Sequence, residues 1–76
     1  MAELLEYLAR QLVDEPDAVR VERVDEDDTV LLRLHVAQED LGKVIGRQGR
    51  IARALRTIVR AGSAREQRRV QLEIVD

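Results

Sequence analysis

The sequence predicts an α+β domain in which three strands form one mixed sheet and helices pack on one face of it. Apolar residues recur at helical spacing in two long segments, and apolar and polar residues alternate in three others. These segments follow the order α-β-β-α-α-β. The chain has 76 residues, which is the length of one small domain, so we expect residues 1–76 to fold as a single unit.

The first predicted element is an amphipathic helix over residues 3–13. Its apolar positions recur at helical spacing, and they are Leu4, Leu5, Leu8, Leu12 and Val13. The run from Asp14 to Asp17 ends this helix, because Pro16 cannot continue one.

Two strands that form a hairpin come next. Residues 19–24 alternate at Val19 and Val21, and Val24 then falls out of phase, which is compatible with a bulge. Asp25–Asp28 is a polar turn. The second strand, residues 29–36, alternates without a break and places Val30, Leu32, Leu34 and Val36 on one face.

The C-terminal half supplies two helices and the last strand. Residues 37–45 predict a short helix that Gly46 ends, and a longer helix begins after Gly49 and ends at Gly62. The apolar stripe of the longer helix is Ile51, Leu55, Ile58 and Val59. Residues 70–74 alternate as a strand, which cannot be a hairpin partner of the second strand because two helices intervene.

The net charge of −2 hides a strong asymmetry along the chain. Residues 1–41 carry 12 acids and 4 bases, a net of −8, whereas residues 42–76 carry 3 acids and 9 bases, a net of +6. From Gly42 to Arg60 there are six bases and no acid. Since distant charges are screened at cellular salt, this local field favours an anionic ligand despite the low overall isoelectric point.

The stretch from Gly42 to Arg50 contains a Gly-x-x-Gly step at Gly46–Gly49. One interpretation is a plain turn between two helices, with the glycines as cap and spacer. The other is a phosphate-binding loop, because Arg47 and Gln48 are long donors and a helix N-terminus follows at once.

Arginine recurs at steps of three, three and four residues on the second of these helices, at Arg50, Arg53, Arg56 and Arg60. Such a stripe is usually a solvated face, but an ordinary exposed helix mixes both signs of charge, and this one does not. The single sign favours a ligand-binding role, most of all for Arg50 and Arg53, which lie next to the loop.

Residues typical of enzymes, metal sites and membrane segments are missing. The chain has no cysteine and one serine, Ser63, and its lone histidine, His35, lies out of phase with the apolar face of its strand. Asp25–Asp28 lacks the spacing and glycine of a calcium loop. We therefore expect no enzyme, cofactor or metal site. Without a signal peptide or a membrane-length apolar run, we expect a cytoplasmic protein with no membrane partner.

The run from Val44 to Ile51 resembles the Ile-Gly-x-x-Gly core of KH domains, and the element order resembles their type II arrangement. The resemblance covers the whole chain and is closest to the KhpA family of small bacterial single-KH proteins. It includes the Leu-Val-Asp-x-Pro-Asp run at 12–17, the approach from Asp40 to Gly46, and the segment from Arg50 to Ala54.

This resemblance implies binding of single-stranded RNA, about four nucleotides per domain, and a role as an RNA chaperone or post-transcriptional regulator. Pairing with a KhpB-like KH-domain protein, a homodimer, and a link to cell elongation and envelope synthesis are also implied. An interaction adaptor with a KH fold that no longer binds RNA is the alternative, and the acidic first half favours it. The RNA-binding residues implied by the motif are Lys43, Val44, Ile45, Gly46, Arg47, Gln48, Gly49, Arg50, Ile51 and Arg53.

Overall fold

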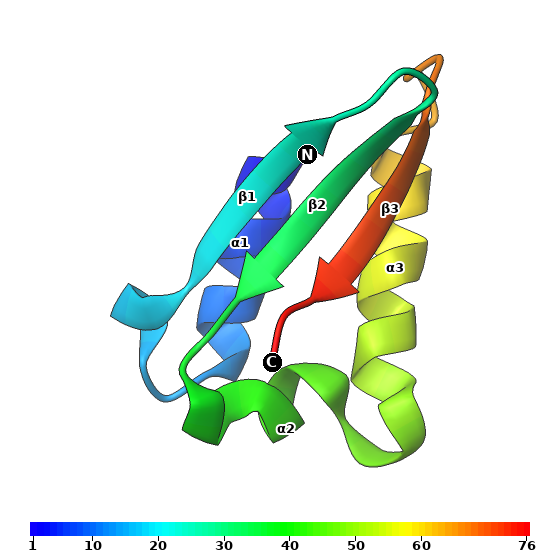
Figure 1. The fold of residues 1–76 in the computed structure, drawn as a ribbon. Coiled ribbons are helices and arrows are strands. Elements are labelled where there is room, and N and C mark those ends of the chain that lie inside the picture. The colour runs from blue at the N-terminus through cyan, green and yellow to red at the C-terminus, as the bar shows by residue number, and fades with distance from the viewer.

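The three strands form one mixed sheet in the order β1-β2-β3, as the computed structural model of residues 1–76 shows (Figure 1). Strand β1 (Arg20–Asp25) is antiparallel to β2 (Thr29–His35), and β3 (Arg69–Ile74) is parallel to β2. The expected mixed sheet is therefore confirmed. Strand β3 pairs on one side only, which leaves a free strand edge beside the last long helix.

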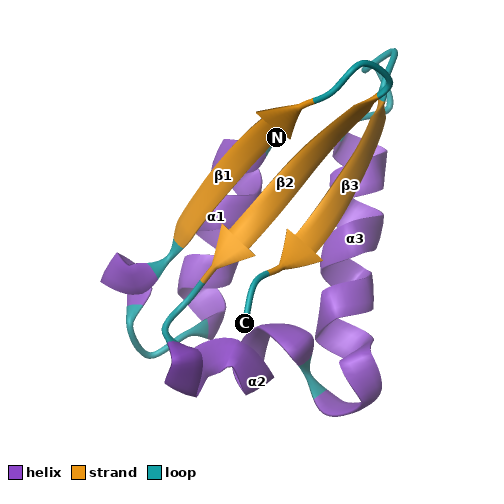
Figure 2. Ribbon diagram, viewed as in Figure 1, coloured by secondary structure: helices purple, strands orange, loops and turns teal.

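Helices α1 (Ala2–Leu12) and α3 (Arg50–Gly62) cover one face of the sheet, and the short α2 (Leu41–Ile45) lies at one end of it (Figure 2). The other face of the sheet carries no helix. The predicted order α-β-β-α-α-β and the packing of the helices on one face are both confirmed. No helix has the combination of length and apolar character that crossing a membrane requires.

Strand β2 is the centre of the core, because it is flanked by strands on both sides. Val30, Leu32 and Leu34 are each at most 1% exposed. They pack with buried residues of both long helices and of β3, namely Leu5, Ala9, Leu55, Val59, Val70 and Leu72. The alternation read from the sequence of β2 therefore gives the correct inward face.

Two local details differ from the expectation. The hairpin has no bulge, since the pairing runs without a break from Arg20 opposite His35 to Asp25 opposite Val30. The phase slip at Val24 instead places this half-buried valine on the face that no helix covers. The expected helix over residues 37–45 is a 3₁₀ turn, Gln38–Asp40, followed by α2.

The inward face of α1 also differs from the expected stripe. Leu5 and Ala9 are fully buried, whereas Leu4 is 43% exposed. Tyr7, the only aromatic residue of the chain, is 59% exposed. A side of this helix that the sequence analysis assigned to the core is therefore partly open to solvent.

Candidate functional site

The Gly-x-x-Gly loop joins α2 to α3 through a single turn over Arg47–Gly49. Gly46 has φ 75° and ψ 172°, a conformation that only glycine adopts without strain. A Cβ at this position would lie 2.6 Å from Cγ1 of Ile51 and 2.9 Å from its backbone nitrogen. Gly49 has φ 74° but open space around its missing Cβ. The first glycine is thus required by both conformation and packing, and the second by conformation alone.

The two middle residues of the loop point their side chains to solvent. Arg47 and Gln48 are both exposed, and neither side chain makes a hydrogen bond or ion pair within the chain. Gln48 has φ 58°, which costs a non-glycine residue about 1–2 kcal/mol. The guanidinium of Arg53 donates a hydrogen bond to the Gln48 carbonyl at 2.9 Å. Arg53 therefore helps to hold the loop in this conformation.

Lys43 is engaged with two carboxylates. Its Nζ lies 3.0 Å from Oδ2 of Asp14 and 3.3 Å from Oδ1 of Asp40. These partners raise the pKa of the Lys43 ammonium above its ordinary value, because it donates hydrogen bonds to the carboxylates of Asp14, the larger cause, and of Asp40. Much of the Lys43 charge is therefore balanced within the protein, unlike the charges of Arg47 and Arg50.

Asp40 connects the loop after α1 to the start of α2. Asp40 is 1% exposed, and its Oδ2 accepts a hydrogen bond from the backbone N–H of Glu15 at 3.1 Å. Burial by itself raises the pKa of the Asp40 carboxyl, but the backbone N–H groups of Glu15 and Asp14 and the ammonium of Lys43 outweigh it, and the pKa is lowered overall. The negative charge of Asp40 therefore stabilises the attachment of α2 to the rest of the domain.

The remaining predicted residues divide between surface and core. Val44 is fully buried, so its side chain supports α2 from the core and does not reach the surface. Ile45 is 38% exposed, and Ile51 is partly buried against the core. Arg50 is exposed and makes no ion pair, and it lines a groove between α1 and α3 that none of the other arginines of α3 lines.

A groove of about 200 Å³ runs between α3 and the free edge of β3. Its floor is apolar and its rim is basic, and its lining residues are Arg56, Val59, Arg60, Val70, Gln71 and Leu72. Arg56 and Arg60 belong to the arginine stripe predicted from the sequence, but the residues from β3 were not predicted. The adjacent pair Arg68-Arg69, just before and at the start of β3, was the sequence signal for further positive charge near this strand.

A second groove, of about 340 Å³, lies on the opposite flank of α3, against α1. It is almost wholly apolar, with Leu8, Leu12, Ile51, Ala54, Leu55 and Ile58 in its lining and Gln11 and Arg50 as its polar members. Ile58 is 38% exposed there. The predicted apolar stripe of α3 therefore faces partly into the core and partly into this groove.

The arginines of the chain differ in whether they are paired. Arg10, Arg23 and Arg33 each form an ion pair with a carboxylate. By contrast, the side chains of Arg47, Arg56 and Arg60 make no hydrogen bond or ion pair with the protein. Three of the unpaired arginines therefore lie at the loop and along the groove beside β3.

A model of the KH domain of KhpA and KhpB proteins matches residues 2–74. The chain belongs to this KH-domain family. It is 51% identical over 75 residues to the RNA-binding protein KhpA of Clostridium acetobutylicum, an alignment that covers 99% of this chain and 100% of that one. The KhpA of Caldanaerobacter subterraneus is 49% identical, with the same coverage.

The similarity extends to a more distant KhpA. The RNA-binding protein KhpA of Bacillus subtilis is 45% identical over 76 residues, which cover all of this chain and 94% of that one. No solved structure gives a significant match. The KhpA/KhpB family is a KH-domain family and not an enzyme family, and the resemblance inferred from the loop motif and the element order is confirmed.

Proposed function

We propose that this protein binds single-stranded RNA at the Gly46–Gly49 loop and along the groove between α3 and β3. The observation that carries the proposal is the row of arginines without internal partners, Arg47, Arg56 and Arg60, beside that loop and groove. Unpaired arginines are poised to contact phosphate oxygens, which dominate the affinity of most RNA-binding surfaces. The names of the KhpA relatives support the same assignment.

The loop is suited to the RNA backbone. The open space at the missing side chain of Gly49 leaves room for a phosphate to approach the main chain, whereas Gly46 makes room for Ile51. The N-terminus of the 13-residue α3 adds a favourable dipole. Arg47 and Gln48 supply donors from solvent-exposed positions, and Arg50 adds charge nearby. Lys43 and Arg53 chiefly stabilise the loop and its surroundings, because the side chains of both already bind partners within the protein.

The groove can accommodate bases, but the contacts that it offers them are weak. Val59, Val70 and Leu72 form an aliphatic floor on which bases pack, and the unpaired backbone edge of β3 can hydrogen-bond to them. Stacking on aromatic rings, worth about 1–3 kcal/mol per base, is missing from this groove, since Tyr7 lies on α1. The expected binding is therefore weak and tolerant of sequence.

The cellular role follows from the family resemblance. We infer a cytoplasmic RNA chaperone or post-transcriptional regulator that pairs with a KhpB-like KH-domain protein and is linked to cell elongation and envelope homeostasis. The apolar groove between α1 and α3 supports a protein partner, because exposed Leu4 and Tyr7 lie on the same helix as its Leu8 and Leu12. The expected occupant is the KhpB-like partner, with a homodimer as the competing outcome.

The RNA proposal is tested with a double variant, Arg47→Asp and Gln48→Asp, titrated with a single-stranded tetranucleotide. Aspartate tolerates the left-handed conformation at position 48, so the fold should survive. We expect binding to be lost, whereas the matched double variant Arg65→Asp and Gln67→Asp, on the exposed loop after α3, retains it. Wild-type affinity in the folded loop variant would refute the proposal.

Two further measurements separate RNA binding from an adaptor role. If the wild-type protein contacts three or four phosphates, log K falls with log salt at a slope of about −2 to −3. A flat salt response, together with stable pairing to a KhpB-like protein, would instead favour the adaptor that has lost RNA binding.

A further inference from the structure

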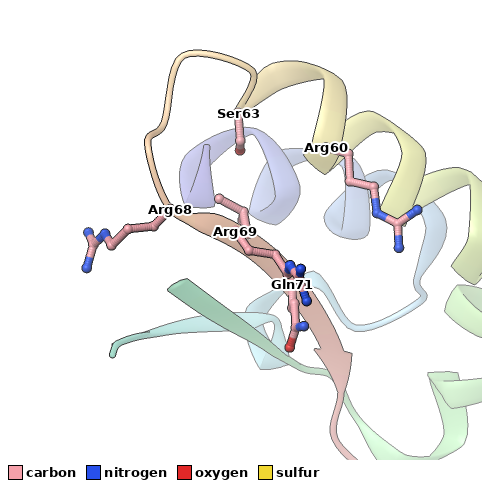
Figure 3. Close-up of a pocket in the computed structure, with 6 residues that line it drawn as sticks. Arg60, Ser63, Arg68, Arg69 and Gln71 are labelled. Carbon is pink, nitrogen blue, oxygen red and sulfur yellow. The ribbon is translucent and has the colours of Figure 1, made fainter. Parts of the chain in front are cut away.

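A pocket of about 430 Å³ lies at the C-terminal end of α3, at the far end of that helix from the Gly-x-x-Gly loop. It continues the groove beside β3, with which it shares Arg60, Val70 and Gln71. Figure 3 shows Arg60 and Ser63 reaching it from α3 and the helix end, and Arg69 and Gln71 from β3. Nothing in the motif of the family points to this pocket, because it lies outside the loop segment.

Two of the three arginines that line the pocket carry charge that the protein does not balance. The side chains of Arg60 and Arg69 make no hydrogen bond or ion pair. Arg68 is different, since its Nη2 lies 2.9 Å from Oδ1 of Asp25 and its Nη1 donates to the Glu26 carbonyl at 3.2 Å. The guanidinium of Arg68 accordingly points away from the others in Figure 3. Arg68 thus binds the turn at Asp25–Asp28, and the guanidinium groups of Arg60 and Arg69 remain without a partner in the protein.

The pocket also contains neutral groups that can hydrogen-bond to an anion. The Ser63 hydroxyl is buried and has no hydrogen-bond partner. A buried polar group without a partner costs free energy, so a ligand that accepts its hydrogen bond gains affinity. Gln71 adds an amide, which can donate to a phosphate or to a base.

We propose that this pocket is a second phosphate subsite for the same RNA strand, a proposal that rests on the RNA-binding function inferred above. Arg60 and Arg69 would contact a phosphate group from two sides, and the Ser63 hydroxyl would donate to it. The strand held at the loop would then run along α3, over the apolar floor of the groove, and end in this pocket.

The length of α3 sets the expected size of the RNA footprint. Ser63 lies thirteen positions after Arg50, which at a rise of about 1.5 Å per residue corresponds to about 20 Å. A Gly-x-x-Gly loop by itself holds about four nucleotides of backbone. A strand that reaches the far pocket must therefore be longer than the tetranucleotide that the loop accommodates.

The experiment compares a tetranucleotide with a decanucleotide, both oligouridylate, on the wild-type protein and on the double variant Arg60→Gln and Arg69→Gln. The control double variant, Arg20→Gln and Arg65→Gln, also removes two positive charges, but from unpaired arginines outside the pocket and the groove beside β3. Thermal unfolding verifies that all variants are folded. Because longer strands gain affinity from their extra binding registers, the decisive quantity is the loss that each variant causes on each length.

We expect the Arg60/Arg69 variant to lose about tenfold in affinity for the decanucleotide but only about threefold for the tetranucleotide, because Arg60 also borders the groove beside β3. The salt slope for the decanucleotide should become shallower by about 0.7 for each phosphate that the variant no longer neutralises. The control variant should change neither affinity by more than about twofold.

Three results would overturn the second subsite without contradicting RNA binding at the loop. One is an equal loss of affinity for both lengths, and another is an equal loss in the control variant. Binding of inorganic phosphate alone with the affinity of the decanucleotide would also overturn it, because the pocket would then serve a free anion. Failure of wild-type protein to bind either oligonucleotide would instead be a failure of the proposed function itself.

Discussion

The two flanks of α3 present opposite chemistry within one turn of the same helix. The flank beside β3 carries Arg56 and Arg60 over a narrow aliphatic floor, and these arginines have no partners in the protein. The flank beside α1 is an apolar groove that includes Ala54 and Ile58. One flank can therefore attract a polyanion, whereas the other can bury an apolar surface of a protein.

Charge alone therefore does not mark the proposed RNA-binding surface, since arginine occurs throughout the fold. On the open face of the sheet, Arg33 lies 3.4 Å from Glu22 and 3.1 Å from Glu73, so its charge is balanced. The arginines beside β3 have no such neighbours. What distinguishes the two sets is the local absence of carboxylates, which leaves the second set available for phosphate.

The largest expected effect comes from a change at Gly46, which precedes the turn from which α3 begins. Gly46→Ala places a Cβ within 2.6 Å of the Ile51 side chain and forces alanine into a glycine-only conformation. We expect unfolding free energy to fall by at least about 2 kcal/mol, as measured by chemical denaturation, with loss of RNA binding.

The matched control for this change is Gly42→Ala. A Cβ at Gly42 meets no heavy atom within 4 Å, and the residue lies inside α2. Alanine should therefore leave stability unchanged or raise it by up to about 1 kcal/mol. Equal destabilisation by both alanines would contradict the special role of Gly46.

Two substitutions, at positions two residues apart on α3, test the functions of the two flanks separately. Arg56→Ala should weaken RNA binding about fivefold, about 1 kcal/mol, and leave partner binding unchanged. Ala54→Glu changes the net charge by the same single unit, but it should lower association with the KhpB-like partner and leave RNA affinity within about twofold. Fluorescence anisotropy with RNA and analytical ultracentrifugation with the partner measure the two effects.

The comparison fails if Ala54→Glu weakens RNA binding as much as Arg56→Ala does. That result would mean that the effect follows net charge and not the flank on which the charge lies. Both positions are on the surface of α3 and both replacements favour helix, so unfolding temperatures should remain close to wild type.

The smallest expected effect concerns Asp40, which attaches α2 to the α1 side of the domain. Because the folded-state pKa of Asp40 is lowered, its contribution to stability is present above the unfolded value of 3.8 and is lost as pH falls through the folded value. We expect Asp40→Asn to lower Tm by about 5 °C at neutral pH and to reduce the decline of Tm below about pH 4. Parallel Tm curves for both proteins across this range would show that the charge of Asp40 contributes nothing.

Much of the fold could be predicted because local patterns and tertiary demands agree. The alternation in β2 gave the right buried face, and the glycines at 46, 49 and 62 marked the helix boundaries to within a residue. The pattern failed on α1, where Leu4 fits the helical stripe as well as Leu5 does. Which of two adjacent leucines faces the core depends on how the helix is rotated against the sheet, and the sequence of the helix does not contain that information.

The loop of the candidate site was visible in the sequence, but the groove was not. Residues 42–53 are contiguous, so their motif could be recognised directly. Arg60, Arg69 and Gln71 come from two elements separated by a loop, and only the parallel pairing of β3 with β2 brings them to one pocket. Likewise, the pairing of Lys43 with Asp14 crosses 29 positions of sequence and reduces the free charge that the sequence alone assigned to this lysine.

The sequence by itself determined the element order, the family and the position of the glycine loop, because each depends on local periodicity, on glycine conformation or on a contiguous motif. The tertiary structure alone decided which arginines are free and which are paired. It also divided the predicted apolar stripe of α3. Val59 lies in the basic groove beside β3, whereas the other members, Ile51, Leu55 and Ile58, line the apolar groove beside α1. Both outcomes depend on the neighbours that packing brings to each side chain from distant parts of the chain.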